Sequence, residues 1–286
     1  MIIVTGATGQ LGRAIVEHLL ARLPASHIGV SVRDPRKADD LLTRGVRVRQ
    51  GDYTDPAGLE HAFEGASQVL IVSSNSAGDG AVGQHGAAIE AARKAGARRI
   101  LYTSHMGASP TSAFPPMRDH AATEALLQAS GVAFTSLRNG FYTDSGVMLM
   151  GDAAQSGTLA QPADGPVSWT THADIAEATA IILADEGRFS GLTPPLTGAQ
   201  ALDLADLAAI ATELTGRPIR RVIVSDEEQR ATMKSRGVPG ARADMMLGLF
   251  MASRQREFAA VDPALQALLG RPPGTVRETL ASNLAR

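Results

Sequence analysis

The residues with the clearest chemical pattern are the glycines of Thr5-Gly-Ala-Thr-Gly-Gln-Leu-Gly12. They follow a short apolar run and open the stretch Leu11–Leu19, whose apolar residues recur every four positions as on one face of a helix. In such a strand–turn–helix, Gly6 permits the tight turn, Gly9 lets a diphosphate approach the backbone, and Gly12 lets the helix pack closely. The free N–H groups at the helix start would then bind the diphosphate of a dinucleotide.

A basic residue, Arg33, follows the second predicted strand, residues 28–32. An acidic residue here usually binds the ribose 2′-hydroxyl of NAD, whereas an arginine accommodates the 2′-phosphate of NADP. Arg33 therefore favours NADPH, with Arg36 or Lys37 as auxiliary charge. Asp34 leaves alternatives open, because it can pair with Arg33 or accept a hydroxyl itself. Without a ligand, the same residues would form a solvated charge cluster at a helix start.

Polar residues also end the third and fourth predicted strands. Asp52 could accept a hydrogen bond from the adenine amino group and Tyr53 could flank the ring, although a plain turn with a helix cap fits equally well. Ser73, Ser74 and Asn75 follow the fourth strand, where they could line the path from the adenosine ribose to the nicotinamide. Ligands of open α/β sheets bind outside the carboxyl ends of the strands, so both clusters are candidate cofactor contacts.

The elements that must position these residues alternate along the first half of the chain. Short apolar runs separated by helical stretches predict βαβ units, and hence an α/β fold with a doubly wound parallel sheet of the Rossmann type. After about residue 140 the pattern is mainly helical, with predicted helices over 172–184, 203–215, 241–256 and 276–285 and a strand over 219–224. We therefore predict an NADP-binding domain over 1–140 and an α-rich substrate lobe over 141–286, with segments that return to the sheet.

The composition excludes several other classes of protein. The 286 residues include no cysteine, which removes disulfides, cysteine metal sites and thiolate nucleophiles, and the net charge of -2 argues against nucleic-acid binding. We see no ligand spacing typical of a metal site. No apolar run approaches about 18 residues and the chain start does not resemble a signal peptide, so we expect no membrane association and a cytoplasmic location.

Further motifs carry a resemblance to a known family: Val32-Arg-Asp-Pro35, Gly51-Asp-Tyr53, Tyr102-Thr-Ser104 and Leu137-Arg-Asn-Gly-Phe-Tyr142. With the glycine motif, they make the chain resemble the NmrA-like branch of atypical short-chain dehydrogenases/reductases, and within it the NADPH-dependent quinone reductases (type 2) and triphenylmethane-dye reductases. The similarity runs over nearly the whole chain. It implies bound NADPH and a substrate cleft between the sheet and the C-terminal lobe. From the motifs and the resemblance together, the expected cofactor contacts are Gly6, Thr8, Gly9, Gln10, Leu11, Arg33, Lys37, Asp52, Tyr53, Ser73, Ser74, Asn75, Thr103, Leu137, Asn139, Gly140 and Phe141.

The tyrosines limit the chemistry, because many short-chain dehydrogenases protonate a carbonyl with a Tyr-x-x-x-Lys pair. None of the three tyrosines here has a lysine four residues on, and the helix predicted over 118–130 carries Glu124-Ala125 where the family pattern can have one. A conjugated acceptor such as a quinone delocalises the incoming charge and needs less help, so we expect that substrate class. The candidate catalytic residues are Ser104, Asn139 (on the resemblance) and Tyr142.

Other residues keep two interpretations each. His105 and His120 are possible proton donors or ordinary polar residues. Four aromatic residues either line a pocket or belong to the core: Phe141, Tyr142, Trp169 and Phe250. Three methionines either form an apolar lid or belong to the core: Met245, Met246 and Met251. Two other functions stay open: an NADP(H)-sensing regulatory protein without turnover, and a specialised biosynthetic reductase or isomerase. A homodimer is expected only by analogy.

Overall fold

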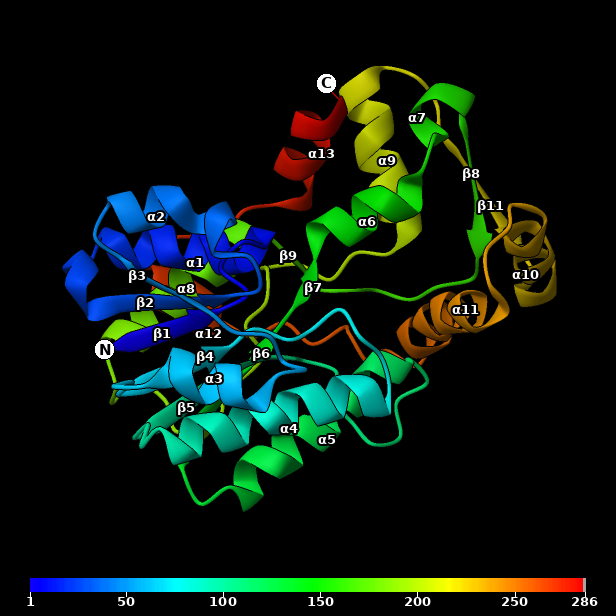
Figure 1. Ribbon diagram of the computed structural model, residues 1–286. Helices are drawn as coiled ribbons and strands as arrows, with labels where there is room; N and C mark the ends of the chain where they lie inside the picture. The colour runs from blue at the N-terminus through cyan, green and yellow to red at the C-terminus, as the bar shows by residue number, and fades with distance from the viewer. Residues whose placement is uncertain (285–286) are drawn as a thin grey trace. The chain divides into compact units, whose positions relative to one another are not determined.

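A seven-stranded parallel sheet forms the centre of the first of two compact units, in a computed structural model that describes residues 1–284 (Figure 1). The strand order is β10-β6-β5-β4-β1-β2-β3, and every pairing in it is parallel. The chain builds outward from β1 in one direction and then from β4 in the other, so the predicted doubly wound α/β fold is confirmed. The strands are β1 (Ile2–Thr5), β2 (Ile28–Val32), β3 (Arg47–Gln50), β4 (Gln68–Ile71), β5 (Arg99–His105), β6 (Ala133–Asn139) and β10 (Gly191–Leu192).

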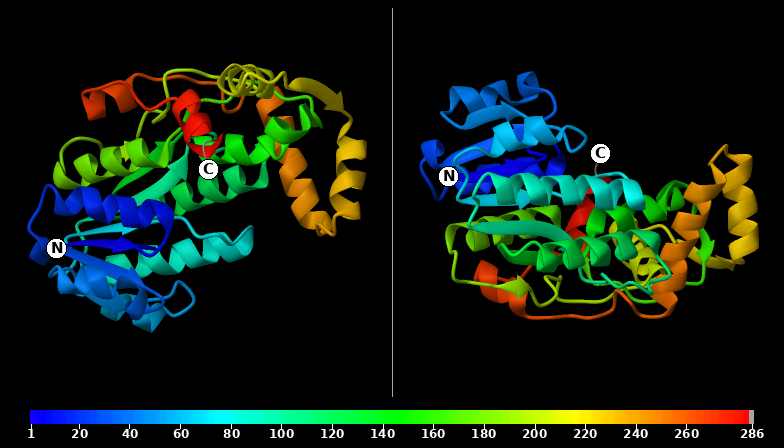
Figure 2. Two further views of the ribbon diagram at one scale, coloured as in Figure 1. Left: turned by 90° about the horizontal axis from the view of Figure 1, so that it is seen from above. Right: turned by 60° about the horizontal axis from the view of Figure 1, so that its bottom comes forward.

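Helices cover both faces of this sheet (Figures 1 and 2). On one face α1 packs beside α8, and the apolar stripe predicted from its four-residue spacing, including Ile15 and Leu19, is fully buried. On the other face, residues of α3, α4 and α5 join Ile3, Ile71 and Tyr102 in one apolar core. The helices are α1 (Gln10–Leu20), α2 (Asp39–Thr43), α3 (Pro56–Phe63), α4 (Asp79–Lys94), α5 (Pro115–Ala129) and α8 (His172–Ala184), with short 3-10 turns η1 (Ala25–His27) and η2 (Pro35–Ala38).

A buried arginine ties the amino ends of the strands together. Arg99 begins β5 and donates to Thr135 Oγ1, to Gln68 Oε1 and to the carbonyl oxygens of Ile182 and Phe189. Burial lowers the pKa of Arg99, and the nearby carboxylates of Glu186 and Asp185 oppose this shift only in part. The network lies at the opposite ends of the strands from the glycine turn, so we assign it to stability.

The second unit comprises Thr111–Met117, Gly140–Thr171 and the described chain from Pro195. It is mainly helical, with two parallel pairs of short strands, β7 with β9 and β8 with β11. Trp169 and Phe250 are core residues, which decides between their two interpretations. Its elements are β7 (Phe141–Tyr142), α6 (Thr143–Met150), α7 (Ala153–Ser156), β8 (Thr158–Pro162), β9 (Trp169–Thr170), α9 (Leu204–Thr215), β11 (Arg220–Val224), α10 (Asp226–Ser235), α11 (Gly240–Arg254), α12 (Ala264–Leu269) and α13 (Val276–Leu284).

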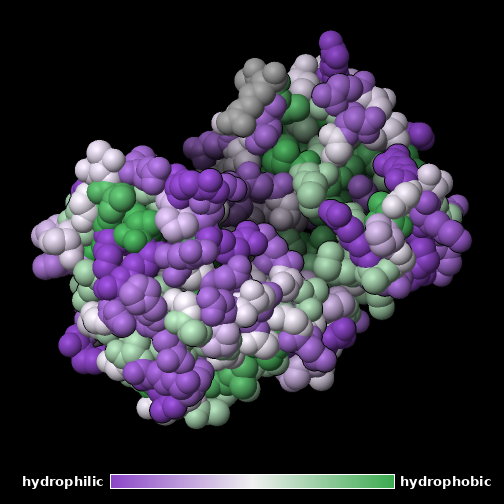
Figure 3. Space-filling model, viewed as in Figure 1, coloured by the Kyte–Doolittle hydropathy of each residue, from purple (hydrophilic) through white to green (hydrophobic). Residues whose placement is uncertain are grey.

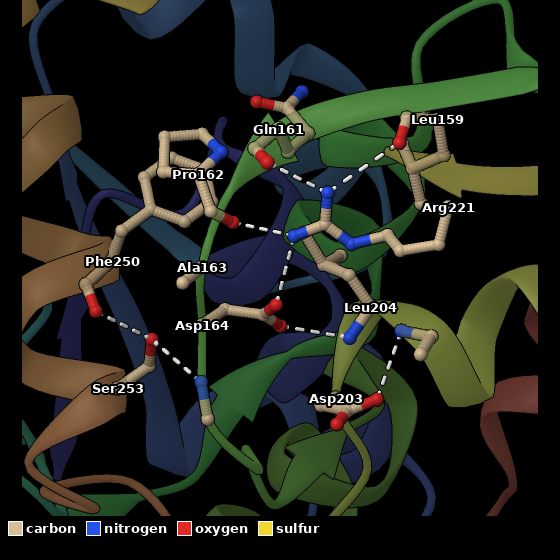
Figure 4. A network of polar contacts seen from close by, with 12 residues as sticks. Leu159, Gln161, Pro162, Ala163, Asp164, Asp203, Leu204, Arg221, Phe250 and Ser253 are labelled. Atoms are coloured by element: carbon tan, nitrogen blue, oxygen red, sulfur yellow. Dashed lines mark hydrogen bonds and ion pairs between the residues drawn. The ribbon is translucent and has the colours of Figure 1, made fainter. Parts of the chain in front are cut away.

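An ion pair joins the strands of this unit to α9 (Figure 4). Arg221 Nη2 lies 3.0 Å from Asp164 Oδ1, and the other carboxylate oxygen accepts the N–H of Leu204 at 2.8 Å. The guanidinium also donates to backbone carbonyls along β8, including that of Gln161. Burial raises the pKa of Asp164 although these partners oppose the shift. All these groups are engaged with one another, so we treat the network as structural.

The observed units depart in two segments from the predicted domains, which divide the chain once, at residue 140. Residues 172–194, with α8 and β10, belong to the sheet unit, and residues 111–117 belong to the second unit.

On the side of the sheet unit seen in Figure 3, apolar residues lie singly or in small groups among hydrophilic ones. Within residues 1–284, no helix is both long and apolar enough to cross a bilayer.

Candidate cofactor site

The turn between β1 and α1 has the geometry that its glycines predict. Gly6 adopts a φ of 61°, which a side chain would strain, and its carbonyl accepts the N–H of Gly9 at 2.9 Å. A Cβ on Gly12 would lie 2.3 Å from the Gly6 oxygen, so only glycine permits this approach of α1 to the turn. Gly9 caps α1 without a side chain. The first N–H groups of the helix, which have no acceptor four residues earlier, therefore remain available to an anion.

The charged residues after β2 divide into one ion pair, Asp34 with Arg36, and two cations, Arg33 and Lys37, for which no ion pair is found within residues 1–284. Asp34 accepts from Arg36 Nε at 2.9 Å, from Arg36 Nη2 at 3.1 Å and from the Arg36 N–H at 3.2 Å, which lowers the pKa of Asp34. Asp34 thus pairs with Arg36 and not with Arg33, an outcome that the sequence left open. Arg33 is exposed and forms no hydrogen bond or ion pair within residues 1–284. Its guanidinium is therefore available to a phosphate beside the end of β2. Lys37 is exposed in η2.

Asp52 and Tyr53 both have internal partners. Asp52 Oδ1 accepts the N–H of Thr54 at 2.9 Å and its hydroxyl at 2.8 Å, and these bonds, with a smaller contribution from Arg33, lower the pKa of Asp52. The Tyr53 hydroxyl donates to the carbonyl of Val72 at 2.7 Å, and burial raises its pKa. The contacts of both residues with an adenine ring stay a prediction.

The loop after β4 is fixed by side chains of the same unit. The Ser73 N–H donates to Thr103 Oγ1 at 2.8 Å, and the Ser74 N–H donates to His85 Nε2 at 2.9 Å. Asn75 is exposed. Thr103 is buried and holds this loop, which is a different role from the direct cofactor contact that we predict for it.

Ser104, a predicted catalytic residue, belongs to a buried polar network. Its hydroxyl donates to Glu124 Oε1 at 2.8 Å, and Ser136 donates to the same oxygen at 2.9 Å. Arg138 forms a two-point ion pair with this carboxylate, at 3.1 Å from Nε and 2.7 Å from Nη2. The Ser104 hydroxyl would have to leave Glu124 to reach a substrate, so its catalytic role stays a prediction.

Sequence reasoning missed this network, although a signal for it existed. Ser136 and Arg138 are two residues apart on β6, and Ser104 is opposite Arg138 in the sheet register, so all three side chains share one face. Glu124 on α5 occupies the position where the family pattern can have a lysine. Its carboxylate accepts hydrogen bonds from all three of these side chains on the sheet face.

Asn139, at the end of β6, is the buried polar residue that most clearly calls for a ligand. It is 1% exposed, and neither its Oδ1 nor its Nδ2 has a hydrogen-bond partner within residues 1–284. Buried side-chain amides are nearly always bonded, because an unsatisfied group loses its hydration without compensation. A carboxamide ligand would supply both the missing donor and the missing acceptor, so Asn139 fits a nicotinamide-bearing cofactor.

Of the other predicted site residues in and after β6, Leu137 belongs to the sheet unit and Gly140, Phe141 and Tyr142 belong to the second unit. Leu137 is fully buried in β6. In the second unit, a Cβ on Gly140 would lie 2.2 Å from Thr170 Oγ1, and Phe141 packs its ring at 5.7 Å from Trp169 and 5.2 Å from Phe258. Tyr142 is half-buried at the end of β7. Cofactor or substrate contacts of these residues stay predictions.

Three histidines form a cluster in the sheet unit, with His85 and His105 buried and His120 half-buried. Sequence reasoning missed His85. The Tyr102 hydroxyl lies 2.8 Å from His120 Nδ1, and the rings of His105 and His120 are stacked at 6.2 Å. Burial lowers the pKa of His85 to about 4 and that of His120 to about 3, and it lowers the pKa of His105 well below its usual range. All three are neutral at pH 7, so none carries a proton ready for donation from an imidazolium.

The described residues hold no group of three or more histidine, aspartate or glutamate side chains suited to a metal ion. The polar groups at the carboxyl ends of the strands instead match a dinucleotide. Comparison with known proteins agrees with this geometry. Residues 6–186 match a family model described as NAD(P)H-binding.

Three relatives illustrate the similarity. The chain is 36% identical to quinone oxidoreductase 2 of Escherichia coli over 98% of each chain, and 31% identical to the NAD(P)H azoreductase of Xenophilus azovorans over 100% of this chain and 98% of that one. The crystal structure of the E. coli enzyme complexed with NADPH superimposes with a TM-score of 0.93 over 100% of both chains, at 35% identity. Triphenylmethane reductase of Citrobacter sp., complexed with NADP(H), gives a TM-score of 0.90 over 99% of both chains, at 34% identity. The chain therefore belongs to the NmrA-like family of NAD(P)H-binding proteins.

Proposed function

We propose that this NAD(P)H-dependent oxidoreductase prefers NADPH and transfers hydride to a quinone or a similar conjugated acceptor without a Tyr–Lys pair. One arrangement carries the proposal. The uncapped glycine turn after β1 lies next to the end of the neighbouring strand β2, where the Arg33 side chain forms no hydrogen bond or ion pair with any described residue. Adjacent strands would thus supply N–H donors for a diphosphate and a guanidinium for a 2′-phosphate, which supports the proposal.

Each part of the site has a role that follows from its chemistry. The N–H groups at the start of α1 bind the diphosphate, and Arg33 pairs with the 2′-phosphate. The Asn139 amide pairs with the carboxamide, which also has one donor and one acceptor face, and so orients the ring. Bound NADPH supplies the hydride. A quinone that accepts it becomes a stabilised hydroquinone anion, which solvent can protonate, so positioning of the two rings provides most of the catalysis.

The relatives support the acceptor class. Their names refer to quinones, azo compounds and triphenylmethane dyes, and all three groups of compounds have conjugated systems that spread the charge of an added hydride. The sequence offers no Tyr-x-x-x-Lys pair for simple ketones, which favours the same class.

The proposal is tested by binding and by turnover. We expect Arg33→Ala to weaken NADPH binding about 10- to 150-fold, because one charge-assisted hydrogen bond contributes about 1.5–3 kcal/mol, and to leave NADH binding nearly unchanged. Arg93→Ala is the control, since Arg93 is exposed on α4 and paired with Glu90. Equal weakening of both coenzymes would refute the 2′-phosphate assignment.

Turnover is followed as NADPH absorbance with a panel of quinones, dyes and enones. Oxidation by quinones or dyes supports the enzyme. Tight binding of NADPH with no oxidation by any acceptor would refute it and favour the sensing function.

A further inference from the structure

The loop between β4 and α4, residues 72–78, uses most of its N–H groups in hydrogen bonds to side chains. Four of them donate to side chains of four different elements of the same unit. The acceptors are Thr5 Oγ1, Thr103 Oγ1, His85 Nε2 and Asp119 Oδ2, at 2.9, 2.8, 2.9 and 2.8 Å from the nitrogens of Val72, Ser73, Ser74 and Gly78. The Ser76 N–H is also used, by Ser74 Oγ at 3.3 Å.

The carbonyl groups of the loop have the opposite arrangement. Those of residues 73–77 accept no hydrogen bond from any residue that the structure describes, and these residues are half-buried or exposed. The loop therefore offers acceptors to a ligand, whereas the glycine turn offers donors. A surface of acceptors repels phosphate oxygens and suits hydroxyl or amide N–H groups.

His85 can hold this loop in only one chemical form. A main-chain N–H can only donate, so Nε2 of His85 must carry a lone pair and no proton. The proton then lies on Nδ1, which donates to Thr123 Oγ1 at 2.9 Å, and that hydroxyl donates to the carbonyl of Asp119 at 2.9 Å. His85 is 2% exposed, and its ring otherwise faces Tyr102 and Tyr53. Burial that lowers its pKa to about 4 keeps the imidazole neutral over the physiological range.

We propose that His85 is a positioning residue, which as a neutral acceptor fixes the Ser74 N–H and so holds loop 72–78 with the carbonyl groups of residues 73–77 available to the sugar hydroxyls and carboxamide of the cofactor. This inference rests on the proposed function for the identity of the ligand. The arrangement of the loop itself does not depend on a ligand.

The first test therefore uses the protein without cofactor. Amide hydrogen exchange at Ser74 is compared in wild type, His85→Leu, His85→Gln and His27→Leu. We expect exchange at least about tenfold faster in His85→Leu, because one buried hydrogen bond is lost. His85→Gln keeps an acceptor oxygen and should restore protection to within about threefold of wild type. His27 is exposed, so His27→Leu should behave as wild type. Unchanged exchange in His85→Leu, or equal exchange in His85→Leu and His85→Gln, overturns the proposal.

Two further readouts separate positioning from general stability. Nitrogen-15 NMR of the wild-type ring should show Nε2 unprotonated and Nδ1 protonated at pH 7. The reverse tautomer overturns the proposal even if a variant fails to fold. In turnover, His85→Leu should raise the KM for NADPH about tenfold with a smaller change in kcat, and His85→Gln should recover most of the loss. A protected Ser74 with the expected tautomer but no NADPH binding by wild type would refute the proposed function and not the loop arrangement.

Discussion

Lowering the pH from 7.5 to 5.5 should destabilise the sheet unit by about 4 kcal/mol, because of its buried histidines. In the unfolded chain a histidine titrates near 6.5. In the folded unit the pKa of His85 is about 4, that of His120 is about 3, and that of His105 is also well below its usual range. Between these values the unfolded state binds protons that the folded state excludes. The free energy of unfolding therefore falls as the pH falls below about 6.5.

The magnitude follows from this linkage. Each histidine contributes about 1.4 kcal/mol per pH unit between its two pKa values, so each loses about 1.4 kcal/mol over the chosen interval. Three give about 4 kcal/mol, a large part of the roughly 5–15 kcal/mol typical of a domain. Carboxylates with lowered pKa, such as Glu17, lose their contribution only at lower pH, below about 4.5.

Urea unfolding followed by far-UV circular dichroism provides the assay. Trp169 is the single tryptophan and lies in the second unit, so its fluorescence serves as a separate probe. A double variant, His85→Gln with His120→Gln, should reduce the loss to about one third, whereas exposed His27→Gln should leave it unchanged. A urea midpoint that does not move between pH 7.5 and 5.5, or an equal loss in the double variant, would show that these histidines do not titrate as we infer.

Two further changes test the network and the turn. Glu124→Gln should destabilise the protein by about 3 kcal/mol, because it leaves the Arg138 guanidinium without its charge partner. As the control, Glu90→Gln removes an exposed ion pair with Arg93 and should destabilise the protein by less than about 1 kcal/mol in the same urea titration. Equal effects would contradict a buried pair. Gly12→Ala should abolish NADPH binding measured by calorimetry, since its Cβ would lie 2.3 Å from the Gly6 oxygen. Gly83→Ala should bind normally and stabilise the protein by about 0.5–1 kcal/mol, since no described residue beyond its own helical turn lies within 4 Å of the added Cβ.

Local features of the fold could be predicted from the sequence because they depend on neighbours in the chain. The glycine turn is one, since the backbone angles of Gly6 and the spacing to Gly12 are local constraints. The alternation of apolar runs and helices also predicted the doubly wound sheet correctly. Asp34 was harder, because two cations lie within two residues of it and only the structure shows that Arg36 takes the carboxylate.

Features that join distant segments could not be predicted in this way. Ser104 seemed a free hydroxyl at a strand end, because its partner Glu124 is twenty residues away on a helix whose rotation the sequence does not fix. His85 lies on an alanine-rich helix, and its role depends on Ser74 and Thr123, which approach it from opposite sides of the ring. That the Asn139 side chain finds no hydrogen-bond partner within residues 1–284 is likewise visible only when every neighbour is placed.

The interleaving of the two units along the chain has a consequence for protein engineering. Each unit is assembled from three separate stretches of sequence, so no single cut yields either one intact. A fragment that stops at residue 140 would lack α8, which packs beside α1, and also β10, the edge strand beside β6. We expect such a fragment to aggregate. A minimal nucleotide-binding module would instead require residues 172–194 to be grafted back through an artificial linker.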